Sequence, residues 1–455
     1  MKKALLTILV LTIFVNSWAA TYYVDPSASG TNSGTLANPW QSISAINQSI
    51  LSPGDQVLFK RGQKYSGTLT ITKSGTSGNP ITFGAYGTGA DPMFYGTGST
   101  ITSLFYMNNR SYITFYGLTI KDTTISATDR TIQSKIQRGF YVDGTSNNIV
   151  IRKCTLDRVG VGAYFVGPNN TIDSCDMGNM RMVVNDNTNP DNDYGANPVV
   201  ISSANNTITN SYFHDCWATS FDYQYDGGAV EFYGDGASNN FIAYNTFYDC
   251  NGVVENGSGN GGTITGNKFA YNVFINNGSL FYINNGGAFV VAVSNMQFYN
   301  NTIIETAMSR LNETYMCGMR TTVSTSGVCV FQNNVFWLQS GVALCRSGQF
   351  NGVQLTHTNN IYRLSGGSVL NFTAGGSETS TSAGIATLWQ SGTGNPITWN
   401  LKPAGSSPLI NYGVAISGLS QDKAGNKLVG LPDAGAYEYT SVSSVRTLSR
   451  FVNGN

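Results

Sequence analysis

Two short segments of the sequence end in glutamate and superimpose without a gap, Gly228-Ala-Val-Glu231 and Gly252-Val-Val-Glu255. If they form strands in consecutive turns of one parallel sheet, Glu231 and Glu255 lie side by side, with backbones about 4.8 Å apart. Two carboxylates this close repel each other unless a cation or a shared proton offsets their charge. The pattern therefore predicts a Ca²⁺ site or an acid–base pair, with two solvated surface glutamates as the alternative.

Further oxygen-bearing side chains lie in loops near these strands. Residues 185–193 read Asn-Asp-Asn-Thr-Asn-Pro-Asp-Asn-Asp, and two more aspartates precede the first glutamate strand. Because Ca²⁺ prefers several carboxylate and amide oxygens, these acids predict a calcium site, and an ordinary polar turn is the alternative. The predicted ligands are Asp186, Asp191, Asp193, Asp222, Asp226, Glu231 and Glu255.

Aromatic residues also precede the first glutamate strand. Trp217, Tyr223 and Tyr225 could stack on sugar rings, and packing of the loop onto the body of the protein is the alternative. Arg346 is expected on the same sheet a few turns further along. We predict these four residues as substrate-binding candidates.

The catalytic candidates are Glu231, Glu255, Tyr282 and Arg320. Tyr282 stands one turn of the repeat beyond Glu255, and Arg320 is expected one or more turns beyond that. With Arg346, they are the available phenolic and basic candidates on this sheet, and a structural surface role is the alternative for each. The two histidines of the sequence belong to other strands, and we find no nucleophilic triad, zinc spacing or phosphate loop.

An internal repeat positions these residues. Eight segments share one register, in which a small polar residue is followed two places later by a large apolar one. The polar positions are Cys154, Cys175, Ser211, Asn245, Asn267, Asn301, Asn334 and Asn360, and the apolar positions are Leu156, Met177, Phe213, Phe247, Phe269, Ile303, Phe336 and Tyr362. Recurrence at intervals of a few tens of residues predicts a solenoid, an all-β parallel β-helix whose turns stack to bury their apolar faces. The asparagines would form a buried hydrogen-bonded ladder.

A second set of strands precedes these turns, and we predict that it forms one parallel sheet. Its members are 139–143, 162–166, 197–202, 228–232, 252–256, 279–283, 318–322 and 341–346. Residues Trp40 to Ile50 have the apolar spacing of a short helix that would cap the solenoid, followed by a first strand at Gln56–Lys60. We expect Cys154, Cys175, Cys216 and Cys250 to be small buried thiols, because neighbours on parallel strands rarely offer disulfide geometry, and disulfides are the alternative.

The N-terminus and the composition bear on location and partners. Lys2 and Lys3 precede an apolar run, and cleavage is expected near Ala19–Ala20, so residues 1–20 are a predicted signal peptide of a secreted protein. Residues 21–439 would form one domain and 440–455 a polar tail. Charged residues make up 11% of the chain and the net charge is zero. We therefore expect no nucleic-acid or membrane partner, and separately we predict a monomer.

The ends of the mature chain resemble a known family. Thr21–Gly30, Gly34–Trp40 and Pro53-Gly-Asp55 resemble the N-terminal coil of secreted pectate-lyase-like β-helix proteins, and 432–439 resembles their closing segment. The resemblance implies a right-handed parallel β-helix and a polysaccharide substrate. Members often use calcium and include lyases, hydrolases, epimerases and non-enzymatic proteins.

This resemblance favours a calcium-assisted polysaccharide lyase that acts by β-elimination on an acidic, uronate-containing polysaccharide. No lysine stands near Glu231 or Glu255, although such lyases commonly use a basic residue there. A glycoside hydrolase that uses the paired carboxylates is the first alternative. A non-catalytic carbohydrate-binding or surface-attachment β-helix is the second.

Overall fold

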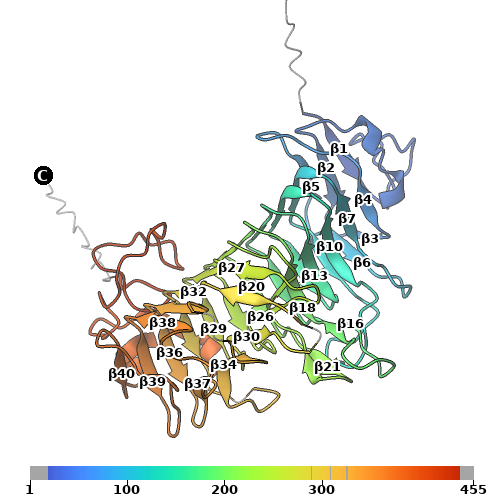
Figure 1. The fold of residues 1–455 in the computed structure, drawn as a ribbon. Coiled ribbons are helices and arrows are strands. Elements are labelled where there is room, and N and C mark those ends of the chain that lie inside the picture. The colour runs from blue at the N-terminus through green and yellow to red at the C-terminus, as the bar shows by residue number, and fades with distance from the viewer. Residues whose placement is uncertain (1–18, 288, 308, 324–325, 441–455) are drawn as a thin grey trace, which may run out of the picture.

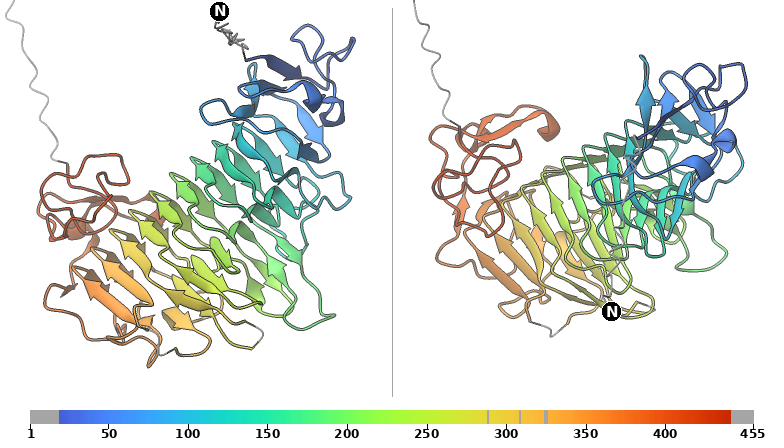
Figure 2. Two further views of the ribbon diagram at one scale, coloured as in Figure 1. Left: turned by 45° about the horizontal axis from the view of Figure 1, so that its top comes forward. Right: turned by 90° about the horizontal axis from the view of Figure 1, so that it is seen from above.

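The computed structural model describes residues 19–440 except 288, 308, 324 and 325. The chain coils into a solenoid with three long parallel sheets, here sheets A, B and C, and the coils advance from one end of the molecule to the other (Figures 1 and 2). The predicted all-β parallel β-helix is confirmed. The predicted signal peptide and tail lie almost wholly outside the described residues. Within the described part of the chain, no helix is long and apolar enough to span a membrane.

Three lists give the strands of the long sheets. Sheet A contains β1 (Thr21–Val24), β2 (Gln56–Lys60), β5 (Ile81–Tyr86), β8 (Ser111–Tyr116), β11 (Asn147–Arg152), β14 (Thr171–Asp173), β19 (Thr207–Thr209), β24 (Phe241–Ala243), β28 (Lys268–Ala270), β32 (Met296–Tyr299), β35 (Cys329–Gln332) and β38 (Leu355–Thr358). Sheet B contains β3 (Lys64–Ser66), β6 (Met93–Tyr95), β9 (Thr119–Lys121), β12 (Thr155–Asp157), β15 (Asp176–Gly178), β20 (Tyr212–His214), β25 (Thr246–Tyr248), β29 (Val273–Ile275), β33 (Thr302–Ile304), β36 (Val335–Leu338), β39 (Ile361–Leu364) and β40 (Thr379–Thr381). Sheet C contains β4 (Leu69–Ile71), β7 (Phe105–Asn108), β10 (Arg138–Asp143), β13 (Val161–Phe165), β18 (Asn197–Ile201), β23 (Val230–Tyr233), β26 (Val254–Gly257), β30 (Phe281–Asn284), β34 (Tyr315–Met319) and β37 (Ala343–Cys345).

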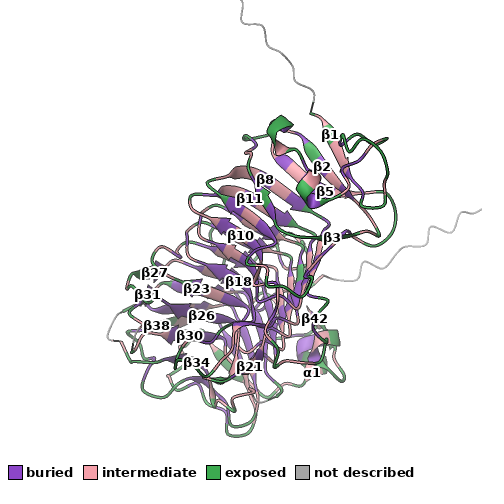
Figure 3. Cartoon of the chain, turned by 90° about the vertical axis from the view of Figure 1, so that its right-hand side faces the viewer, coloured by how far each residue is buried: buried purple, intermediate pink, exposed green. Residues whose placement is uncertain are grey.

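Sheet C confirms the second predicted set of strands. Alternate side chains of each strand point into the coil, where they stack on the equivalent residues of the next coil, and the inner faces are buried (Figure 3). Phe105 and Phe140, for example, stack with ring centroids 5.0 Å apart. The outward side chains form straight columns along the solenoid, because the parallel register holds from coil to coil.

Buried asparagines form hydrogen-bonded ladders at the turns. In the turn between sheets A and B, the main-chain N–H of Asn272 donates to Oδ1 of Asn301, and that of Asn301 donates to Oδ1 of Asn334, each at 2.9 Å. Asn245 precedes them and Asn360 follows them in the same ladder. The side-chain amides also donate to backbone carbonyls, so the turns leave few buried polar groups unpaired.

One register assignment from the sequence is wrong. Asn267 and Phe269 were predicted in columns that the structure gives to Asn272 and Phe274, and Phe274 pairs with Phe247. Asn267 instead belongs to a second ladder, in the turn before sheet A, where its Oδ1 accepts the N–H of Asn240 at 2.9 Å. Asn-Lys-Phe and Asn-Val-Phe follow each other closely here, so both fit the repeat pattern.

The N-terminal segment differs from the predicted helix. Residues 40–50 form two short 3₁₀ turns, η1 (Ile43–Ala45) and η2 (Gln48–Ile50). The side chain of Asn47 accepts the N–H of Ser49, which caps the second turn and interrupts a continuous helix. The predicted strand Gln56–Lys60 is β2. All seven cysteines are buried and free, including the four expected as buried thiols.

The remaining elements are antiparallel hairpins outside the coils, one short parallel pair within the coils, and a C-terminal segment. Four two-stranded pairs are β16 (Met182–Val184) with β17 (Tyr194–Gly195), β21 (Ala218–Ser220) with β22 (Gln224–Asp226), β27 (Thr263–Thr265) with β31 (Ala292–Ser294), and β41 (Trp389–Ser391) with β42 (Asn400–Pro403). The C-terminal segment, with α1 (Ile385–Leu388) and η3 (Pro396–Thr398), packs on the outer face of sheet B. There Leu388, Trp389 and Leu409 cover outward apolar residues of β29, β33, β36 and β39.

Candidate functional site on the outer face of sheet C

The two glutamates occupy one outward column of sheet C. Glu231 on β23 pairs directly with Glu255 on β26, and Glu255 pairs with Tyr282 on β30. The expected adjacency of these residues is therefore confirmed. Val200 precedes Glu231 in the column and Gly318 follows Tyr282. Val200 and Gly318 carry no polar side chain, so Glu231, Glu255 and Tyr282 are the polar residues of this stretch of the column.

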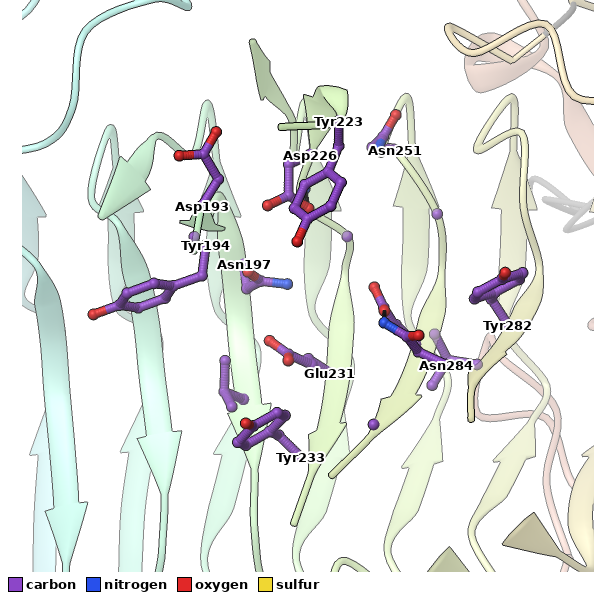
Figure 4. A pocket seen from close by; sticks show the side chains of 18 of the residues that line it. Asp193, Tyr194, Asn197, Tyr223, Asp226, Glu231, Tyr233, Asn251, Tyr282 and Asn284 are labelled. Atoms are coloured by element: carbon purple, nitrogen blue, oxygen red, sulfur yellow. Dashed lines mark hydrogen bonds between the residues drawn. The ribbon is translucent and has the colours of Figure 1, made fainter. Parts of the chain in front are cut away.

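A cavity of about 810 Å³ lies over this part of sheet C. Figure 4 shows Glu231 at its base and Tyr223 and Asp226 above it, from the β21–β22 hairpin. The predicted site residues that line the cavity are Asp191, Asp193, Tyr223, Tyr225, Asp226, Glu231, Glu255, Tyr282 and Arg320. The lining does not include Asp186, Trp217, Asp222 or Arg346, which the structure places elsewhere.

The electrostatics of the cavity favour protonated carboxyl groups. Burial, followed by the charges of Glu255 and Asp226, raises the pKa of Glu231 to about 8. Burial, followed by the charge of Glu255, raises the pKa of Asp226 to about 8 as well. Burial also raises the pKa of Glu255, but a hydrogen bond from Asn284 opposes the shift. Glu231 and Asp226 therefore favour the protonated form at neutral pH, whereas a hydrogen bond from Asn284 stabilises the carboxylate form of Glu255.

A short hydrogen-bond chain supports Glu255. Nδ2 of Asn284 donates to Oε1 of Glu255 at 3.2 Å, and Nη1 of Arg320 donates to Oδ1 of Asn284 at 3.3 Å. Arg320 comes directly after β34, whose strand ends earlier than the sequence predicted. Sequence reasoning missed Asn284, although it stands two residues after Tyr282 and so points to the same face.

Other lining residues were also missed. Arg138, at the start of β10, lies over the rings of Tyr141 and Tyr164, with its Cζ 4.9 Å and 5.7 Å from their centroids. Tyr194 and Glu313 line the cavity from segments outside sheet C. Arg138 immediately precedes a glycine-led strand that the sequence did identify, so its position could have been found from the register.

Three predicted metal ligands accept hydrogen bonds from loop residues. Carboxylate oxygens of Asp193 and Asp222 accept hydrogen bonds from backbone N–H groups of neighbouring loops. Asp186 accepts bonds from Thr188 and Asn192 within its own loop. Among the residues that the structure describes, no group of three His, Cys, Asp or Glu side chains is arranged to hold a metal ion. Five of the seven predicted ligands, Asp191, Asp193, Asp226, Glu231 and Glu255, line the cavity, and calcium binding stays a prediction.

Comparison with protein families agrees with the geometry. Residues 138–336 match the model of the right handed beta helix region. The matched segment contains both glutamates and most of the lining of the cavity. The chain therefore folds as a right-handed parallel β-helix.

Solved structures show how widely this β-helix fold is shared. The β-helix resembles the pectate lyase Pel9A with a TM-score of 0.56 at 17% identity, over 93% of this chain and 97% of that one. It resembles a rhamnogalacturonan lyase with a TM-score of 0.50 at 16% identity, over 75% of this chain and 87% of that one. The fold of polysaccharide-degrading enzymes is therefore present here, and these identities establish the fold alone.

Curated relatives match shorter parts of the β-helix. The uncharacterized protein YwoF of Bacillus subtilis (strain 168) is 30% identical over 136 residues, which cover 29% of this chain and 27% of YwoF. A lacto-N-biosidase of Bifidobacterium longum is 42% identical over 84 residues, which cover 17% of this chain and 5% of that enzyme. The chain thus corresponds to a small part of each relative.

Two predicted substrate-binding residues of the β-helix lie away from the cavity. Guanidinium groups of Arg130 and Arg310 lie over the ring of Trp217, with their Cζ atoms 4.5 Å and 4.0 Å from its centroid. The ring is therefore engaged in packing, which was the alternative interpretation. Arg346 lies over the ring of Tyr315 at 5.2 Å, outside the lining of the cavity.

Proposed function

We propose that the protein is a secreted glycoside hydrolase that cleaves a polysaccharide or oligosaccharide chain bound across sheet C. One observation carries this proposal: neighbouring carboxyl groups in one cavity have unlike environments. Glu231 accepts no hydrogen bond within the described residues, whereas Glu255 accepts one from Asn284. Environments that differ in this way give two carboxyl groups different roles, here a proton donor and a carboxylate nucleophile.

Each carboxyl group then has a role. Glu255, as a carboxylate, attacks the anomeric carbon, and the bond from that carbon to the leaving oxygen breaks. Glu231 gives its proton to that oxygen. Water then adds to the anomeric carbon, gives its proton to Glu231 and releases Glu255. Backbones about 4.8 Å apart suit the carboxyl separation of about 5 Å in enzymes that retain the anomeric configuration.

The lacto-N-biosidase similarity adds modest support, because that enzyme's name denotes a glycosidase and its matched segment is 42% identical. The cavity supports hydrolysis more directly. Within the described residues its lining contains no lysine or histidine, so the groups available for proton transfer are mainly carboxyls and phenols.

A polysaccharide lyase is the second candidate. Tyr282 follows Glu255 in the column, and Arg320 lies in the same cavity, so a uronate proton could be taken beside a guanidinium. Burial raises the pKa of Tyr282, which makes its ionised form costly and disfavours this base. A lyase would also need a cation to neutralise the carboxylate of its substrate. The predicted calcium could do this, and adding a chelator tests it.

The test is to incubate the purified protein with a panel of neutral and acidic glycans, with and without a chelator. We expect new reducing ends without ultraviolet absorbance of an unsaturated uronic acid. Glu231→Gln and Glu255→Gln should each lower kcat by about 10²- to 10⁴-fold, as loss of a positioned acid or base does. Asp235→Asn removes an exposed acid of the same coil outside the lining and serves as the control.

Three other outcomes decide against this reading. A rise in ultraviolet absorbance that the chelator abolishes would establish the calcium-assisted lyase instead. A folded Glu231→Gln, Glu255→Gln double variant with full activity would remove the site. Binding without cleavage across the panel would leave a carbohydrate-binding β-helix.

Export is the remaining part of the proposal. The apolar N-terminal segment with small residues at Ala19 and Ala20 supports cleavage there. Sequencing the N-terminus of protein recovered from the culture medium should give Ala20 or Thr21. An intact Met1 in exported protein would overturn the cleavage.

A further inference from the structure

Two hairpins stand beside the cavity. The first hairpin, residues 182–195, joins β16 to β17, and the second hairpin, residues 218–226, joins β21 to β22. Both are antiparallel, unlike the coils from which they project. Figure 1 shows β16 and β21 close together at one side of the solenoid, and their residues are in contact.

A buried carboxylate of the first hairpin binds the tip of the second. Oδ2 of Asp193 accepts hydrogen bonds from Oγ of Ser220 at 2.6 Å and from the N–H groups of Phe221 at 2.8 Å and Asp222 at 3.1 Å. Oδ1 of Asp193 accepts the N–H of Asp186 at 2.8 Å, within its own hairpin. The side chain is 5% exposed, so these donors replace water almost completely.

A carboxylate of the second hairpin binds the first in return. Oδ2 of Asp222 accepts the N–H groups of Asn192 at 2.9 Å and Asp193 at 3.0 Å. Asn185 adds a further link, because its Nδ2 donates to the carbonyl of Thr219 at 3.0 Å. We call the mutual bonds of Asp193 and Asp222 the clasp. Charged acceptors make stronger hydrogen bonds than neutral ones, so the clasp joins the two hairpins into one wall.

This wall carries side chains into the cavity. Tyr194 follows Asp193 directly, and Tyr223 follows Asp222 directly. Both tyrosines line the cavity, yet they are 42% and 37% exposed. Asp226, at the end of the second hairpin, points into the same space (Figure 4). Partly exposed aromatic rings at the edge of a cavity can stack on the apolar face of a sugar ring, and this contact removes both faces from water.

We propose that Asp193 and Asp222 are positioning residues whose clasp places Tyr194 and Tyr223 against the sugar that lies over Glu231 and Glu255. This inference rests on the proposed function, because it requires a glycan in the cavity. It assigns a role to two residues that the sequence suggested as calcium ligands. The clasp needs no metal, since backbone N–H groups already occupy the carboxylate oxygens that face the opposite hairpin.

The first test is kinetic, on a glycan that the wild type cleaves. Asp193→Asn and Asp222→Asn each weaken charged hydrogen bonds, and in one side-chain orientation an NH₂ group faces an N–H donor. We expect KM to rise about tenfold, the loss of about one such bond, with little change in kcat. The double variant should lose no more than the worse single one, because both belong to one unit. Asp186→Asn, whose side chain bonds only within the first hairpin, should leave KM unchanged.

The second test needs no substrate. Hydrogen exchange should speed up at the amides of Asn192, Asp193, Phe221 and Asp222 in both clasp variants, while amides of sheet C stay protected. Unchanged exchange at these amides would overturn the clasp, whatever the activity. Two results would overturn the positioning role. One is faster exchange in the clasp variants with an unchanged KM, and the other is an Asp186→Asn control that changes kcat and KM as the clasp variants do. If the wild type cleaves no glycan, the proposed function and the positioning role fail together, and exchange still decides whether the clasp exists.

Discussion

Replacing Asn284 by alanine should make catalysis more sensitive to acid. Asn284 donates to Oε1 of Glu255 at 3.2 Å, and this bond opposes the rise in the pKa of Glu255 that burial causes. Without the bond, the pKa of Glu255 rises further, so less of the carboxylate is present at low pH. A hydrogen bond to a charged group contributes about 1.5 kcal/mol or more, and 1.4 kcal/mol corresponds to a factor of ten. We expect kcat/KM to fall about tenfold on the acid limb of the pH profile.

The loss should diminish as pH rises, because Glu255 is ionised in both proteins at sufficiently high pH. The assay is the initial rate of reducing-end release at subsaturating glycan across the pH range. Asn285→Ala is the matched control, since Asn285 exchanges two hydrogen bonds with Thr321 in the same turn. An equal loss at every pH, or the same loss in the control, would refute the assignment of Glu255 as the carboxylate that Asn284 stabilises.

Three further predictions concern the scaffold. Asn301→Ala should lower the free energy of unfolding by about 3 kcal/mol in urea titration, because it leaves the carbonyl of Phe269 and the N–H of Asn272 unpaired in a buried turn; a change below about 1 kcal/mol would contradict the ladder. Burial opposes protonation of His214, but hydrogen bonds to Asp176 and Asp215 outweigh it and raise its pKa from 6.5 to about 9. The stabilisation is therefore full below about pH 6.5 and lost as pH rises through 9, so His214→Asn should flatten the dependence of Tm on pH over this window. The seven cysteine thiols should react with a thiol reagent only after unfolding, and rapid reaction of the native protein would contradict their burial.

The sequence predicted what depends on regular repetition. Glu231 and Glu255 follow matching strand patterns, and the parallel register makes such residues neighbours. The same reasoning misplaced Asn267, because two nearby Asn-x-Phe segments satisfy the pattern equally well and only backbone pairing separates them. The repeat pattern therefore predicts whether a side chain points into or out of the coil more securely than it predicts which column the residue belongs to.

Loop contacts could not be predicted in this way. In the sequence, Asp193 and Asp222 resemble metal ligands because they are acidic residues in polar loops. The backbone N–H groups that donate to them come from the opposite hairpin, and the sequence does not reveal that contact. Trp217 likewise looks like a sugar platform until the structure places two arginines over it. Both depend on contacts between distant insertions, which follow no repeat.

The asparagine ladders also bear on how such a protein can change its length. In each rung the main-chain N–H of one asparagine donates to Oδ1 of the asparagine in the next coil. Every coil therefore offers the same acceptor to the coil before it. A whole coil could be gained or lost by tandem duplication or deletion with the ladder closing again across the join. Under the proposed function, Glu231 and Glu255 need only two consecutive coils, so added coils could lengthen the surface for a longer glycan and leave the two glutamates unchanged.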